Sequence, residues 1–223
     1  MDTHPSLEIK SSKAIYVTLA VVVLGIFSNS FFCTGWHTAA LLAFGVYSSL
    51  VIISIINKDV LLQKLLVFAL VAGFAELFAD NWLVNTIKIL EYEKGPSIMA
   101  SPIYMPFAWA TVLTQIGFVG WQKAKRMGMW KACLLAAALG GLVIPLYEYS
   151  AYGACWWYYN DPGHMIFYTP YLIIIGEALL SLVLPVMIRE IVFKKSIVWI
   201  VPAGVVMGLW IWGSYYIGYL IAN

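Results

Sequence analysis

Four carboxylic acids lie in stretches of sequence that are otherwise apolar. Glu76 and Asp80 are four residues apart in "GFAELFADNWLVN", and Glu148 and Glu177 occur in two later apolar stretches. A spacing of four places Glu76 and Asp80 on one face of a helix. An ionisable side chain inside a membrane span costs about 2.5–3.5 kcal/mol on insertion scales, so it usually faces a bundle interior or a functional cavity. These four acids are therefore the candidate catalytic residues.

The composition indicates which elements position them. The 223 residues are 62% hydrophobic and 11% charged, with a mean hydropathy of +0.86, whereas soluble domains are about 25% charged. A helical span needs about 20 apolar residues. The long apolar runs do not alternate with polar residues, which favours helices over barrel strands. The sequence predicts one all-α integral membrane domain, residues 1–223, with seven transmembrane helices at about 14–32, 36–57, 61–84, 102–121, 131–151, 166–188 and 197–221.

The basic residues predict an orientation in the membrane. With seven crossings, every lysine and arginine except Lys88 and Lys94 falls on the side of the N-terminus. Positive residues favour the cytoplasmic face, so we expect a cytoplasmic N-terminus and an external C-terminus. The same rule makes the basic segment "KAKRMGMWK" a topology signal, and no nucleic-acid partner is expected. The expected location is the plasma (inner) membrane of a bacterium or the endoplasmic reticulum of a eukaryote.

The four acids are expected at similar depth and partly uncharged. At 1.5 Å per residue, all four lie within roughly 12 Å of the outer interface. Because burial disfavours the charged form and no basic residue shares this depth, at least one of Glu76 and Glu177 should be protonated near neutral pH. Such an acid can donate a proton while a second carboxylate accepts one. In the alternative interpretation the acids form structural hydrogen bonds between helices, with Asp80 and Glu148 wetted at the interface.

Aromatic residues are concentrated in the outer loops. The aromatic belt that forms at membrane interfaces explains part of this excess, but the inner loops show no comparable density. An aromatic face can stabilise a nearby cation by about 0.5–2 kcal/mol. The candidate substrate-binding residues are Trp82, Tyr92, Tyr104, Trp109, Tyr147, Trp156, Trp157 and Tyr171.

Metal and thiol chemistry receive little support from the sequence. The histidines are His4, His37 and His164, and there is no HExxH or CxxC motif, so no metal site and no cofactor are expected. Cys33 and Cys155 both fall on the predicted outer side. A disulfide between them is possible in an oxidising compartment, but two free thiols are the favoured expectation.

The order of several residues resembles a known group of proteins. An intramembrane acid is followed by a tyrosine-bearing loop, a Gly-Pro and a helix that begins with spaced prolines before a tryptophan. The second half has a glycine and a proline in a span, then an outer loop with tryptophan and tyrosine, and then a proline six residues before a glycine at the start of the next helix. The residues are Glu76, Tyr92, Gly95, Pro96, Pro102, Pro106, Trp109, Gly141, Pro145, Trp156, Trp157, Tyr158, Pro170 and Gly176. This order resembles the polytopic carotenoid-biosynthesis proteins that hydrate terminal double bonds. More distantly, it is similar to the small seven-span terpene cyclases. The resemblance implies proton-initiated chemistry on isoprenoids without metal or cofactor, with Glu76 as the acid.

Two functions are compatible with these features. The first is a cofactor-independent cyclase or hydratase, hence an isomerase or lyase, which takes a lipid-soluble isoprenoid substrate from the bilayer. The alternative is a small proton- or cation-coupled transporter that uses the same carboxyl groups. Transporters often contain paired repeats. Because the sequence shows no recognisable repeat and an odd number of spans, the enzyme is the favoured interpretation.

Overall fold

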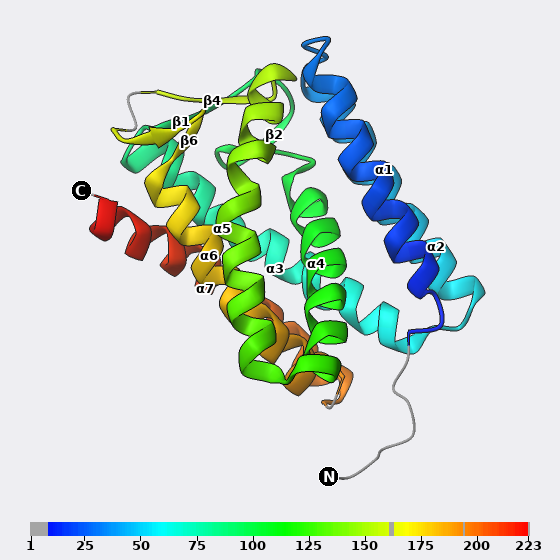
Figure 1. Cartoon of the computed structure of the whole chain (residues 1–223). Helices are drawn as coiled ribbons and strands as arrows, with labels where there is room; N and C mark the ends of the chain where they lie inside the picture. Colours follow the sequence, from blue (N-terminus) through cyan, green and yellow to red (C-terminus); the bar gives the residue numbers. More distant parts are fainter. Residues whose placement is uncertain (1–8, 161–162, 194, 223) are drawn as a thin grey trace.

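The structure is a computed structural model that describes residues 9–160, 163–193 and 195–222, and these residues are mostly helical (Figure 1). Two helices continue beyond their α-helical part as short π-helical segments, α3 into η1 (Trp82–Thr86) and α6 into η2 (Ile188–Val192). The long helices are α1 (Ser12–Ser30), α2 (Trp36–Ile56), α3 (Val60–Asn81), α4 (Met105–Met127), α5 (Met129–Gly153), α6 (Tyr171–Met187) and α7 (Ile197–Ala222).

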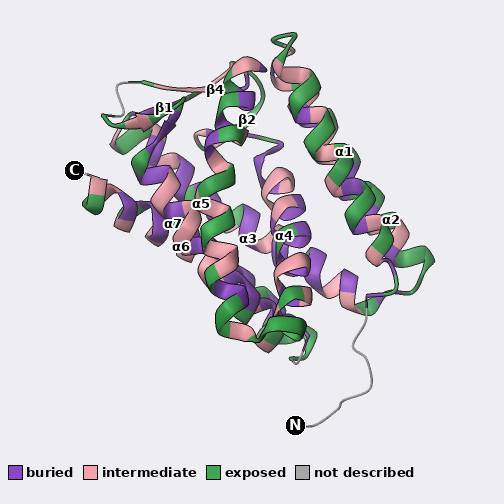
Figure 2. Cartoon of the chain, in the orientation of Figure 1, coloured by how far each residue is buried: buried purple, intermediate pink, exposed green. Residues whose placement is uncertain are grey.

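Six of these helices are long and apolar enough to cross a membrane, which indicates a membrane protein. Many of their residues are exposed, as the green stretches of α1, α2 and α5 show in Figure 2, and the exposed residues include many large apolar ones. Phe31, Leu41 and Leu142, for example, are largely exposed. An apolar surface of this extent is typical of contact with lipid, because a soluble protein would aggregate through it.

Helix α4 was also expected to cross the membrane, but it is not among these six helices. It is the more polar helix, with Gln115 near its middle and Gln122 and Lys123 in its second half. Its neighbours are α3, α5, α2 and α6, so much of its surface meets other helices rather than the surroundings. A helix covered in this way needs fewer apolar residues than one that faces lipid.

Small residues allow the helices around α3 to approach closely. A side chain at Gly73 of α3 would place its Cβ 2.3 Å from the carbonyl oxygen of Pro106 in α4. On the other face of α3, a Cβ at Gly208 of α7 would lie 2.5 Å from the carbonyl oxygen of Ala72. Without a hydrophobic driving force between helices in lipid, such backbone contact is a main source of packing energy. Helix α3 is therefore held between α4 and α7, and this position fixes the direction of its acidic face.

A layer of short strands covers the end of the bundle that carries the α1–α2 turn (top of Figure 1). Strand β1 (Leu90–Tyr92) pairs antiparallel with β4 (Trp157–Tyr159), so that Tyr92 lies opposite Trp157. Two hairpins complete the layer, β2 (Ser97–Ile98) with β3 (Ser101–Pro102) and β5 (Met165–Ile166) with β6 (Thr169–Pro170). The expectation of an all-α chain is therefore wrong for these loops. Their tyrosine, tryptophan and isoleucine residues favour strands once the helices bring them together.

The structure also contains an internal repeat, which corrects the expectation that there is none. The order helix, strand, hairpin, helix occurs first as α3, β1, β2–β3, α4 and again as α5, β4, β5–β6, α6. The hairpin turns use a left-handed residue at the same place, Met99 in one and Phe167 in the other. Gly141 of α5 packs on Ile174 of α6 as Gly73 packs on Pro106. Equally spaced pairs along the chain are Gly73 and Gly141, Asp80 and Glu148, Met99 and Phe167, Ser101 and Thr169, and Pro102 and Pro170.

The α1–α2 turn is fastened to this layer by covalent and hydrogen bonds. Cys33 and Cys155 form a disulfide, with 4.9 Å between their Cα atoms, so the expectation of two free thiols is wrong. Beside it, the backbone N–H of Gly35 donates to the carbonyl oxygen of Ala154 at 2.9 Å. Gly35 has φ of +71° and its Cβ position is filled by the carboxyl group of Glu93, so only glycine fits there. The α1–α2 turn thus meets the loop that follows α5, a contact that the short segment "FFCTGW" did not by itself predict.

We predict that the disulfide contributes measurably to stability. It closes a chain segment with a sequence separation of 122 residues, so replacing Cys155 by serine should lower the free energy of unfolding by about 2–4 kcal/mol. The measurement is thermal unfolding in detergent, with Cys133→Ser as the control because Cys133 is a free cysteine. Mass spectrometry of the unreduced protein should yield a peptide that contains both Cys33 and Cys155. Two separately alkylated thiols at these positions would contradict the prediction.

Candidate functional site

Glu76 lies on α3 at the centre of the candidate site. Its side chain is fully buried, and neither carboxyl oxygen has a hydrogen-bonding partner. Asp80, Glu177 and the indole of Trp109 are its nearest polar neighbours. A buried polar group without a partner costs about 1–3 kcal/mol, so the fold maintains Glu76 here at the expense of stability.

Asp80 lies one helical turn further along α3 and is bound from the strand layer. The phenol of Tyr92 in β1 donates a hydrogen bond of 2.7 Å to Asp80 Oδ2. Burial, together with the Asp80 and Glu76 carboxyl groups, raises the pKa of Tyr92 well above its ordinary value. The phenol therefore keeps its proton and acts as a hydrogen-bond donor to Asp80.

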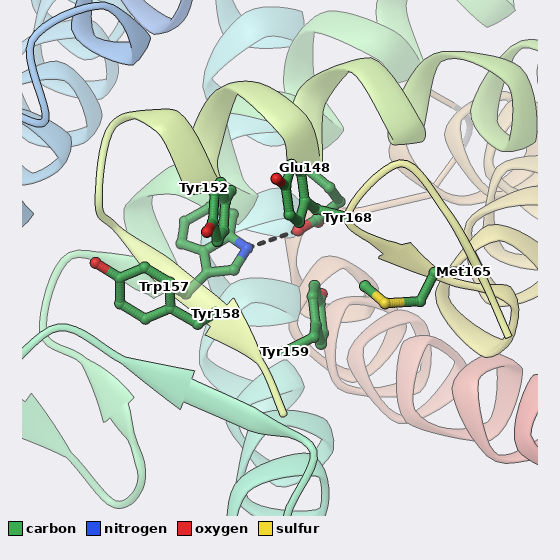
Figure 3. Close-up of a pocket in the computed structure, with 7 residues that line it drawn as sticks. All are labelled: Glu148, Tyr152, Trp157, Tyr158, Tyr159, Met165 and Tyr168. Atoms are coloured by element: carbon green, nitrogen blue, oxygen red, sulfur yellow. Dashed lines mark hydrogen bonds between the residues drawn. The ribbon is translucent and has the colours of Figure 1, made fainter. Parts of the chain in front are cut away.

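Glu148 and Glu177 each accept one hydrogen bond from an aromatic side chain. The indole N–H of Trp157 in β4 donates to Glu148 Oε2 at 2.6 Å, the dashed line in Figure 3. The phenol of Tyr215 in α7 donates to Glu177 Oε1 at 2.7 Å. Tyr215 reaches Glu177 because the neighbouring residue, Gly176, leaves room for its ring. Each acid is thus held by a neutral donor rather than by a cation.

The four acids form one cluster between α3, α5 and α6. Glu76 interacts electrostatically with Asp80 and Glu177, and Glu148 interacts with Glu177 and Asp80. Arg189 and Glu190 form an ion pair at the surface, which involves none of the four acids. Four negative charges in a dry interior without counter-ions would be very costly, so the cluster keeps protons.

The strand pair β1–β4 closes the cluster from above. Successive residues of a strand point to opposite faces, so Tyr92, Trp157 and Tyr159 share the face that points to the acids. Tyr159 lies beside Glu148, and burial with the nearby carboxyl groups raises the pKa of its phenol well above the ordinary value. On the opposite face, Glu91 is exposed and accepts a hydrogen bond of 2.8 Å from the Asn160 side chain. The layer therefore shields the acids with neutral donors and aromatic rings.

The burial of the acids differs from their expected depths. Asp80 and Glu148 are only 3% and 6% exposed, so the interpretation that they are wetted at the interface is wrong. Glu177, which was expected to be one of the two deepest, is instead half-buried. The strand layer accounts for the burial of Asp80 and Glu148, because it covers helix ends that would otherwise meet water.

One small pocket borders the cluster at Glu148, and a second shares Trp157 with it. The first, shown in Figure 3, has a volume of about 20 Å³ and is lined by Glu148, Tyr152, Trp157, Tyr158, Tyr159, Met165 and Tyr168. Tyr152 and Tyr168 stack there with ring centroids 3.8 Å apart. The second has a volume of about 40 Å³ and lies between α1, α2, α4 and α5, with Tyr104, Tyr147, Trp156 and Trp157 in its lining. Trp157 belongs to both pockets.

Most of the predicted aromatic residues lie near the acids, but two do not. Tyr92, Tyr104, Trp109, Tyr147, Trp156 and Trp157 contact the cluster or line a pocket. Trp82 instead packs against Tyr216 and Tyr219 of α7, with ring centroids 5.9 and 5.6 Å away. Tyr171 is exposed beside His164.

Three residues of the site were not among the predicted ones: Tyr159, Tyr215 and Ser101. Ser101 is fully buried beside Asp80. Tyr159 alternates with Trp157 along one strand, and this period of two was a usable signal. No signal in the sequence orients Tyr215, because α7 is apolar on all sides.

Neither described histidine joins the acids. The ring of His37 stacks on Trp36 at 3.9 Å, and His164 packs on Tyr171 at 5.8 Å. Within the described ranges, no group of three or more histidine, cysteine, aspartate or glutamate side chains is arranged to hold a metal ion.

Comparison with known proteins places the chain in a family but does not assign a function. No curated protein and no solved structure matches it. One family, described as a domain of unknown function, matches residues 77–222. The match includes Asp80, Glu148 and Glu177 and the whole of the strand layer. Because it covers more than half of the sequence, this chain belongs to the DUF6989 family.

Proposed function

We propose that this protein is a membrane enzyme that performs acid-initiated chemistry, of the cyclase or hydratase type, on a lipid-soluble isoprenoid. The observation that carries the proposal is Glu76. Its carboxyl group is fully buried, its oxygens are unpartnered, and its closest polar neighbour is a second acid. A buried carboxyl group without a counter-ion can carry a proton and transfer it to a substrate.

The other groups have roles that follow from their contacts. Proton transfer from Glu76 to an alkene carbon forms a C–H bond and leaves a carbocation, which the π faces of Trp109 and the strand-layer aromatics stabilise. One ionised carboxylate of the cluster, Glu148 or Glu177, removes a proton from the cation, which gives a new alkene, or from a water that adds to it, which gives an alcohol. That proton then passes to Asp80 as Asp80, held by Tyr92, reprotonates Glu76, and the cluster returns to its starting state. The chemistry requires neither a metal nor a redox cofactor.

A transporter remains the second candidate because of the internal repeat. Repeats with acids at their interface are typical of proton- and cation-coupled transporters. Asp80 and Glu148 occupy equivalent places in the two units, and Tyr92 and Trp157 bind them from paired strands. The aromatic covering and the apolar second pocket favour the enzyme, since a path for ions needs water-accessible polar groups on both sides.

The proposal includes an orientation in which all seven helices cross the membrane and the N-terminus is cytoplasmic. The turns that follow α2, α4 and α6 lie at one end of the bundle, away from the strand layer (Figure 1). Lys58 and Lys195 lie in two of these turns, and Arg126 lies in the last turn of α4. Positive residues favour the cytoplasmic face. The Cys33–Cys155 disulfide lies at the other end, as expected for an oxidising compartment. The second lysine of the turn after α6, Lys194, lies outside the described residues.

Replacing Glu76 or Glu177 by glutamine should abolish product formation while the protein still folds. Removal of a general acid or base lowers the rate by about 10²–10⁴-fold, and glutamine keeps the shape of the side chain. The measurement compares isoprenoid products in lipid extracts of cells that express each variant. Glu91→Gln is the matched control, because Glu91 is a carboxyl group of the same strand layer that faces away from the cluster.

Lipid extracts that are identical for Glu76→Gln and the unaltered protein would contradict the enzyme proposal. If the same variant also lost proton-coupled uptake in reconstituted vesicles, the acids would be assigned to transport.

Removing the donor to Asp80 should have a smaller effect than removing Glu76. Tyr92→Phe deletes one hydrogen bond to a carboxyl group and leaves the ring in place, so we expect a loss of about 5–100-fold in product formation, consistent with about 1–3 kcal/mol. Tyr16→Phe is the control, since Tyr16 of α1 is 47% exposed and lines neither pocket. Equal effects of the two substitutions would show that the hydrogen bond to Asp80 has no role in turnover.

The orientation predicts that α4 carries the chain across the membrane. In a Cys133→Ser background, a membrane-impermeant thiol reagent added to intact cells should label Lys94→Cys but not Lys123→Cys, and both should be labelled after permeabilisation. Lys94 and Lys123 are exposed and lie before and near the end of α4, respectively. Labelling of both in intact cells would overturn the seven-crossing arrangement.

A further inference from the structure

The second pocket lies in the seam between the α1–α2 hairpin and the helices α4 and α5. Val22 and Ile26 of α1 and Ala39, Leu42 and Ala43 of α2 form one wall. The opposite wall is formed by the first turns of α4 with Tyr147 of α5, and Trp156 and Trp157 complete the lining. The lining is mostly apolar with a few polar atoms, which is the usual composition of a small-molecule site.

Two residues that line this pocket carry a buried hydroxyl group without a hydrogen-bonding partner. Tyr104 and Thr111 are 2% and 3% exposed, and neither the Tyr104 phenol oxygen nor Thr111 Oγ1 forms a hydrogen bond. They are seven residues apart, two turns of helix, and both line the pocket. Buried hydroxyl groups normally have partners. A ligand oxygen that accepts their hydrogen bonds would supply what the protein itself does not.

The pocket is large enough for only one end of a lipid. Its volume is about 40 Å³, a few times the 10–15 Å³ that one water needs on a comparable measure. Val22 and Leu42 at its edge are half-buried, and their neighbours Val21 and Leu41 are exposed on the apolar outer surface. A chain attached to the bound end can therefore leave between Val22 and Leu42 and continue in the surrounding lipid.

One side chain, Trp157, lies between this pocket and the acid cluster. Trp157 lines this pocket and also the first one, and its indole N–H is bonded to Glu148. Tyr147, in the same pocket, packs against Trp157 with ring centroids 5.9 Å apart. A ligand in the second pocket thus lies against the ring that covers Glu148.

We propose that this pocket binds the oxygen-bearing end of an isoprenoid lipid, with Tyr104 and Thr111 donating hydrogen bonds to its oxygen. The chain extends from the pocket along the seam between α1 and α2. The isoprenoid identity rests on the proposed function, whereas the position of the site rests on the pocket and its unpartnered hydroxyl groups. The α1–α2 hairpin then forms one wall of the binding site, and the disulfide fastens this wall to the strand layer.

Photolabelling of the purified protein in detergent tests the site directly. The probe is an isoprenoid ketone that carries a diazirine, and the reference probe is the matching diazirine hydrocarbon without oxygen. The ketone should label peptides from α1, α2 and α4. Tyr104→Phe and Thr111→Val should each reduce labelling by the ketone about 3–10-fold, the effect of one lost hydrogen bond, and leave the weaker labelling by the hydrocarbon unchanged.

A steric pair of variants provides a second test. Ala39 lines the pocket, whereas Leu41, on the same helix, is 74% exposed. Ala39→Phe should fill the pocket and abolish labelling by the ketone, and Leu41→Phe should not change it. An intact Cys33–Cys155 link in each variant shows that the protein is folded.

The outcomes separate this inference from the proposed function. Ketone labelling that is unchanged by Tyr104→Phe, Thr111→Val and Ala39→Phe overturns the site, whatever Glu76→Gln does to product formation. Displacement of the probe by a straight-chain ketone as well as by the isoprenoid ketone overturns the isoprenoid assignment. Labelling as expected, together with normal products from Glu76→Gln, supports the site and contradicts the enzyme proposal. Glu76→Gln itself should label like the unaltered protein.

Discussion

The exclusion of counter-ions from four neighbouring carboxyl groups is the constraint on which the rest of this structure depends. In a dry interior such groups are tolerated when they keep protons and receive hydrogen bonds from neutral donors. Tyr92, Trp157 and Tyr215 supply those bonds, and each comes from a different element: β1, β4 and α7. The strand layer is therefore part of the chemistry of the cluster as well as its cover. Without it, water would reach Asp80 and Glu148 and the acids would ionise.

The internal repeat explains how one chain builds this cluster and why the cluster is asymmetric. Asp80 and Glu148 occupy equivalent positions of the two units, and the paired strands β1 and β4 bind them in equivalent ways. Glu76 and Glu177 have no such counterparts, since the same spacing places Ile144 and Trp109 at the equivalent positions. Two acids of the cluster thus follow the repeat and two depart from it. Groups with different surroundings can divide the roles of proton donor and acceptor.

Much of the fold could be predicted from the sequence because apolar length is a strong signal. The ranges expected for the helices differ from the observed ones by a few residues at their ends. Helix α4 gives the weakest signal for a membrane span, because it is the least apolar of the long helices. Which face of each helix points inward was not predictable, since uniformly apolar helices have no polar side to orient them. Tyr215 and Trp82 illustrate this, one reaching an acid and the other packing away from the acids. The strands and the disulfide were missed for another reason: they depend on contacts between loops far apart in the sequence, such as Tyr92 with Trp157 and Cys33 with Cys155.

The central claim is that Glu76 is held protonated inside the bundle, and infrared spectroscopy of the purified protein measures this directly. The carbonyl stretch of a protonated carboxyl group is separate from the bands of a carboxylate. At neutral pH the unaltered protein and the Glu91→Gln variant should both show this stretch at equal intensity, and Glu76→Gln should have lost part of it. A spectrum of Glu76→Gln that loses carboxylate intensity instead, with the protonated band unchanged, would show that Glu76 is ionised and would contradict the account.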